Sequence, residues 1–114
     1  MAKNVTIYHN PKCTTSQHVL AMIEETGARP KVVEYLKAGW TKPQLKALFA
    51  AAGLTPREAM RKKAAEDLGV SEKATAAQIL DAMVEHPVLV ERPFVETAKG
   101  VRLCRPKEKV RELL

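Results

Sequence analysis

The sequence predicts an α/β fold built on a mixed four-stranded sheet. Two observations lead to this prediction. A β-rich segment, an amphipathic helix and a second β-rich segment follow one another near the N-terminus, and two further β-rich segments and a helix close the chain. A purely helical pattern separates these two parts. With 114 residues and 12.6 kDa, the chain is long enough for one domain but too short for two.

The N-terminal elements have the spacing of a βαβ unit. Residues 5–8 alternate between β-favouring side chains and predict a strand. A helix is expected from about Thr15 to Thr26, with Gly27 as its stop signal. Residues 31–36 predict a second strand. A right-handed crossover through this helix would make the two strands parallel.

The middle of the chain predicts helices only. Thr41, Thr55 and Thr75 are each followed three residues later by Gln or Glu, which is the capping-box pattern. We therefore expect three helices joined by short loops, with residues 64–70 ambiguous. His86 precedes a proline, and the residue before proline disfavours helix, so the third helix should end there.

The C-terminal part predicts a hairpin and a last helix. Residues 93–95 and 101–104 are β-rich and close together, so they should pair antiparallel around a turn at Lys99 and Gly100. Pro106 opens the final helix. The full order, β-α-β, a helical insertion after the second strand, then β-β-α, is that of a thioredoxin-like fold. Its core would comprise residues of about 1–40 and 88–114, and the insertion about 41–87.

Composition excludes several classes of protein. Hydrophobic residues make up 46% of the chain, which excludes a disordered protein. The net charge of +6 is spread out and aromatic residues are only 4%, so we expect no nucleic-acid partner. No apolar stretch approaches the ~20 residues of a membrane span, and we expect no signal peptide in the first residues. We expect a cytoplasmic protein without a membrane partner.

Cys13 carries the chemistry that the sequence predicts. It lies in the turn between the first strand and the first helix, where unpaired N–H groups and the helix dipole favour the thiolate and can bind an anion. A free cysteine can also pack as a small hydrophobe, but polar and turn-forming neighbours argue against that here. Ser16 replaces the second cysteine of a Cys-x-x-Cys pair, so an external thiol must resolve any adduct.

Cys104 has the opposite prediction. Its place in a strand favours a buried core cysteine over a second redox cysteine. No Cys/His spacing suits zinc, so we expect no metal. Glycines are few and scattered, so no phosphate loop is predicted either.

Four blocks of the chain resemble the glutaredoxin-linked arsenate reductases. The blocks are residues 8–16 (the nucleophile loop), 59–63, 86–93 and 102–106. The resemblance implies reduction of arsenate to arsenite through a cysteine–arsenate adduct on Cys13. It implies glutathione as co-substrate, glutaredoxin as partner and no tightly bound cofactor. It also implies that three arginines hold the oxyanion, namely Arg61, Arg92 and Arg105, while His9 and Ser16 tune the thiolate by charge and hydrogen bonding.

Arginine suits this task because its planar guanidinium stays charged and can engage two oxygens at once. Two positions depart from the family pattern: Thr14 stands where Gly is frequent, and Gln17 where Arg is frequent. A related thiol oxidoreductase with another substrate therefore stays open. An Spx-type redox-sensing regulator is the weaker alternative, because those proteins typically have Cys at the position of Ser16.

Overall fold

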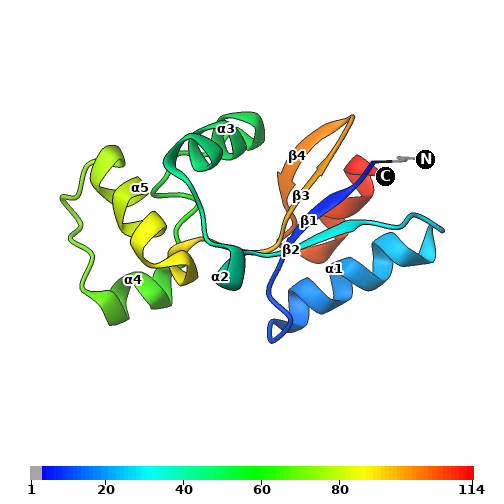
Figure 1. Ribbon diagram of the computed structural model, residues 1–114, viewed down its shortest axis with the longest axis horizontal. Coiled ribbons are helices and arrows are strands. Elements are labelled where there is room, and N and C mark those ends of the chain that lie inside the picture. The colour runs from blue at the N-terminus through cyan, green and yellow to red at the C-terminus, as the bar shows by residue number, and fades with distance from the viewer. Residues whose placement is uncertain (1–3) are drawn as a thin grey trace. The chain divides into compact units, whose positions relative to one another are not determined.

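The computed structural model describes residues 4–114 and divides the chain into two compact units. The first unit comprises Met1–Ala38 and Arg92–Leu114, and the second comprises Gly39–Glu91. Figure 1 shows strands only in the first unit and helices in both. Within residues 4–114, no helix has the length and apolarity needed to cross a membrane.

The first unit contains the predicted mixed sheet. Its strands are β1 (Thr6–His9), β2 (Lys31–Glu34), β3 (Phe94–Thr97) and β4 (Gly100–Leu103). They lie in the order β2-β1-β3-β4. β1 and β2 are parallel, whereas β3 is antiparallel to both β1 and β4. The predicted α/β fold class and both predicted strand pairings are therefore confirmed.

One face of this sheet is covered by α1 (Thr14–Glu25) and by the 3₁₀-helix η2 (Lys107–Leu113). Apolar side chains of the strands and of both helices form one core cluster, which contains Val5, Ile7, Val19, Ile23, Val95, Cys104, Val110 and Leu113. The alternation of β1 points every second side chain toward this face. His9, two residues after Ile7, therefore faces the side that α1 covers.

The second predicted strand is shorter than expected. It ends at Glu34 and is followed by the short helix α2 (Tyr35–Ala38). Glu34 pairs with His9, the last residue of β1, so the chain beyond Glu34 has no neighbouring strand on that side. Without ladder partners, the backbone satisfies its hydrogen bonds locally.

The second unit holds three α-helices and a 3₁₀-turn. They are α3 (Lys42–Ala52), α4 (Lys62–Leu68), α5 (Ala76–Glu85) and η1 (Pro87–Leu89). The capping boxes predicted at Thr41 and Thr75 are both present, with the threonine side chain and the Gln side chain three residues later bonded reciprocally. α5 ends before His86, as the following proline predicts.

The helix predicted to begin at Thr55 is wrong. Thr55 and Glu58 do exchange the two hydrogen bonds of a capping box, but the chain continues as a turn and the helix begins only at Lys62. The reason is a tertiary contact, because Met60 forms a β-bridge with Val90. The Arg61 N–H donates to the Leu89 carbonyl at 2.7 Å, so this backbone is extended instead of helical.

Candidate functional site

Cys13 is the N-cap residue of α1, in the loop that follows β1. Its backbone is extended, with φ −93° and ψ 121°. Its N–H donates to the Asn10 carbonyl and its own carbonyl accepts from Gln17, both at 3.0 Å. The sulfur therefore stands at the amino end of a helix, where free N–H groups favour negative charge.

Two arginines meet this sulfur because of the strand order. β3 begins, and β4 ends, at the edge of the sheet where β1 ends. Arg92 precedes β3 and Arg105 follows β4, so both lie beside the loop that carries Cys13. Arg105 Nη1 lies 3.8 Å from Cys13 Sγ and also donates to the Arg92 carbonyl at 3.1 Å. The peptide bonds after both arginines, to Pro93 and Pro106, are cis.

The pKa of Cys13 results from opposing effects. Burial is the largest single effect and raises the pKa, since only 9% of the residue is exposed. The backbone N–H of Ser16 donates to the sulfur and lowers the pKa, and so do the positive charge of Arg92 and side-chain hydrogen bonds from Arg92 and Arg105. Together these groups outweigh burial and hold the pKa of Cys13 below its ordinary value. The thiolate is the nucleophilic form of cysteine, so the site favours reactivity.

Behind Cys13, His9 and Ser16 form a buried pair. His9 Nδ1 and Ser16 Oγ are 2.6 Å apart, and the Asn10 N–H donates to the same hydroxyl at 3.1 Å. Burial lowers the pKa of His9, against the opposing charge of Glu34. The lowered pKa favours the neutral imidazole, and His9 is within hydrogen-bond distance of Ser16 in this loop.

Two residues near Cys13, one in the loop and one in the first turn of α1, were not predicted as site residues. Asn10 is buried, and its Oδ1 accepts the Lys12 N–H at 3.0 Å. The Gln17 side chain donates to the Pro11 carbonyl, although the sequence suggested only the loss of a positive charge there. The Asn10-Pro11 pair is a turn signal that could have revealed the role of Asn10. Nothing in the sequence indicated the hydrogen bond of the Gln17 side chain.

Arg61 lies in the second unit, where it is the N-cap residue of α4. Its backbone is held on both sides, since its N–H donates to Leu89 and its carbonyl accepts from Ala65. Its role with Cys13 stays a prediction.

Cys104 is a core residue, as predicted. It is fully buried and belongs to the core cluster under α1 and η2. Burial raises its pKa to about 12, with a further contribution from Glu112. Both cysteines are free thiols. In the part of the chain that the structure describes, no three His, Cys, Asp or Glu side chains gather as metal ligands.

Comparison with known proteins identifies the family of this chain. The sequence profile of the ArsC family matches residues 8–113. The chain belongs to the ArsC family. ArsC-family relatives include "Arsenate reductase ArsI2" of Synechocystis sp., which is 61% identical over 96% of this chain and 81% of its own length. An arsenate reductase of Escherichia coli is 44% identical over 97% of this chain and 81% of its own length.

Solved structures of the ArsC family match the fold. An arsenate reductase from Vibrio cholerae has a TM-score of 0.91, with 37% identity over 100% of both chains. A putative arsenate reductase from Yersinia pestis has a TM-score of 0.89, with 40% identity over 95% of this chain and 98% of its own. The predicted thioredoxin-like fold and the predicted family are thereby confirmed, and the chain is an enzyme of the ArsC family.

Proposed function

We propose that this ArsC-family enzyme reduces arsenate to arsenite with Cys13 as its nucleophile. The observation that carries the proposal is the Cys13 sulfur at the start of α1 with Arg92 and Arg105 beside it. The same groups that lower the pKa of the thiol are donors of the kind that bind an oxyanion.

The arginines reduce the electrostatic repulsion between the Cys13 thiolate and arsenate. A thiolate and an arsenate anion repel each other, and oxygen must leave arsenic as sulfur attacks. Guanidinium groups offset that repulsion and stabilise the negative charge on the oxygens. Arg61 is proposed as the third such group, on the strength of its place in the family pattern. His9 and Ser16 are proposed to tune the Cys13 thiolate by charge and hydrogen bonding, as the family pattern implies.

The electron balance requires thiols from outside the chain. Cys13 attacks arsenic, an S–As bond forms, and one oxygen leaves as water. Reduction of As(V) to As(III) then takes two electrons, which two thiols supply when they join as a disulfide. Cys104 is buried and its pKa is about 12, so it does not serve as the second thiol. We propose glutathione as the thiol that enters on the adduct and glutaredoxin as the protein that releases arsenite by thiol exchange.

This chemistry fits a reducing compartment, and we propose a cytoplasmic location and no tightly bound cofactor. The test is arsenate-dependent oxidation of NADPH coupled through glutathione reductase, glutathione and glutaredoxin. We expect turnover that saturates with arsenate. No turnover at high arsenate, in an assay where the Escherichia coli relative works, would refute the proposal. Reduction of a small disulfide without arsenate turnover would favour the alternative thiol oxidoreductase.

A further inference from the structure

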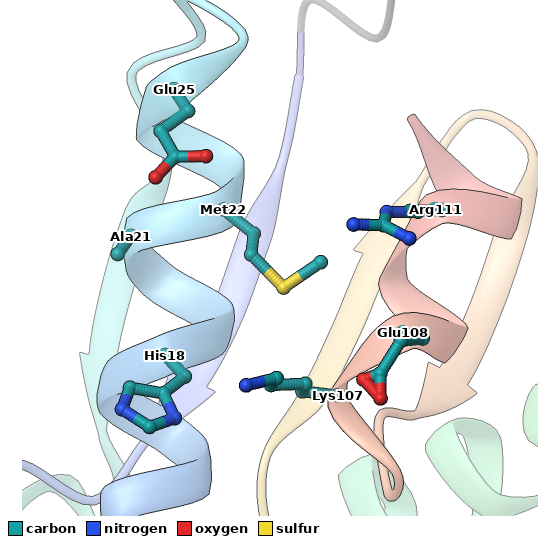
Figure 2. Close-up of a pocket in the computed structure, with 7 residues that line it drawn as sticks. All are labelled: His18, Ala21, Met22, Glu25, Lys107, Glu108 and Arg111. Carbon is teal, nitrogen blue, oxygen red and sulfur yellow. The ribbon is translucent and has the colours of Figure 1, made fainter.

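A groove in the first unit runs from Arg105 along α1 and η2. It consists of two adjoining cavities of about 440 and 340 Å³, which share His18, Lys107 and Glu108. The larger cavity includes Arg105, whose Nη1 is 3.8 Å from Cys13 Sγ. The smaller cavity continues to Glu25 on α1 and Arg111 on η2 (Figure 2). Cys13 itself lines neither cavity, but one end of the groove is formed by Arg105, the residue that contacts the nucleophile.

The groove has the length of a short peptide. From Thr15 to Glu25, α1 rises about 15 Å at about 1.5 Å per residue. A tripeptide in extended form spans about 10 Å. A tripeptide can thus lie along the groove, with the thiol side chain of its middle residue extending toward Arg105.

The groove carries charged side chains of both signs that can pair with a bound ligand. Figure 2 shows Glu25 on one wall and Arg111 on the other, with Lys107 reaching from η2 toward α1. Glu25, Lys107, Glu108 and Arg111 take part in none of the ion pairs within 4 Å that residues 4–114 form. All four residues are exposed, so their charges face whatever enters the groove.

We propose that this groove binds glutathione, an inference that rests on the proposed glutathione-dependent function. At neutral pH glutathione carries two carboxylates and one ammonium group. Its γ-glutamyl end, a zwitterion, lies between Glu25 and Arg111, so that each of its charges has an opposite partner. Its glycine carboxylate lies toward Lys107, and its thiol points past Arg105 to Cys13.

The first test measures the KM for glutathione in the coupled arsenate assay. Arg111→Glu and Glu25→Lys should each raise this KM about fivefold or more. The matched controls are Arg29→Glu and Glu24→Lys, two exposed positions of the same unit outside the groove, which should stay within about twofold of wild type. The two groove variants change the net charge in opposite directions. If both variants raise the KM for glutathione, the cause is the loss of local charge pairs with glutathione. A long-range attraction between the protein and anionic glutathione would change in opposite directions in the two variants.

The second test needs no arsenate. Cys13 thiolate attacks one sulfur of oxidised glutathione, forms a mixed disulfide and releases one glutathione thiolate, and mass spectrometry follows the rate. The comparison reagent is hydroxyethyl disulfide, which carries no charge. Both groove variants should lower the ratio of the two rates about fivefold relative to wild type and to the controls.

These results separate the two proposals. If the ratio falls while arsenate is not turned over, the groove binds glutathione and the proposed activity is wrong. If the ratio and the KM for glutathione both stay within twofold of wild type in variants with an unchanged thermal melt, the groove does not bind glutathione. In that case arsenate reduction can still stand.

Discussion

The Arg105 guanidinium lies 3.8 Å from the Cys13 sulfur, although 92 positions separate the two residues in sequence. The same guanidinium donates to the Arg92 carbonyl at 3.1 Å. Arg105 thus links the nucleophile to the backbone of the second arginine. A substitution at Arg105 should therefore affect both the state of the thiol and the position of Arg92.

The two cysteines should behave differently on replacement. Cys13→Ser should abolish arsenate-dependent NADPH oxidation, because a serine hydroxyl stays protonated at neutral pH. Cys104→Ser should keep most of the activity per folded molecule, since this thiol is buried in the core and its pKa is about 12. Activity surviving in Cys13→Ser, or vanishing in a folded Cys104→Ser protein, would contradict the assignment of Cys13 as the nucleophile.

The lowered pKa of Cys13 predicts a pH profile for its alkylation. Burial opposes ionisation, but the Ser16 N–H, Arg92 and Arg105 outweigh it. A lower pKa means that more thiolate is present at a given pH below the ordinary value. The rate with iodoacetamide in the Cys104→Ser background should therefore reach half its maximum at a lower pH than for a cysteine in an unstructured peptide.

Arg105→Ala is the informative variant for this profile. Without the guanidinium, the midpoint should move to higher pH, toward the unperturbed cysteine. Arg29→Ala, an exposed position of the same unit, is the matched control and should leave the midpoint in place. An Arg105→Ala profile with the same midpoint as wild type would show that this arginine does not stabilise the thiolate.

Arg92→Lys tests whether the arginine fork matters beyond its charge. Lysine keeps the positive charge but loses the planar pair of donors, so kcat/KM for arsenate should fall on the order of tenfold. Arg29→Lys should change it by less than about twofold. Full activity in Arg92→Lys would show that arsenate reduction needs only a positive charge at this position and not the planar pair of donors.

Ser16→Ala tests the buried hydroxyl under the loop. The substitution removes the partner of His9 Nδ1 and of the Asn10 N–H, all within a buried site. Leaving such groups unpaired should lower the free energy of unfolding by about 1–3 kcal/mol. Urea denaturation measures this change, with Thr14→Ala, an exposed position of the same helix, expected to stay within about 0.5 kcal/mol. Equal stability of the two variants would mean that the hydroxyl contributes nothing.

Local patterns predicted the elements where tertiary contacts did not compete. Thr41 and Thr75 begin helices, as their capping boxes predict. Thr55 has the same pattern and even the same side-chain hydrogen bonds, yet no helix follows. The Met60–Val90 bridge draws the next residues into an extended backbone. That pairing joins positions thirty residues apart, so no local window could reveal it.

The sequence by itself determined the order of the four strands, most of the helices and the place of Cys13 at the start of α1, because periodicity and turn residues act over a few positions. Only the tertiary structure decided how Arg92 and Arg105 lie against the Cys13 sulfur, with Arg105 Nη1 3.8 Å from it. The physical reason is the sheet: its strand order and register return distant segments to one edge. The pKa of each thiol then follows from the charges, N–H groups and apolar side chains that this arrangement places around it.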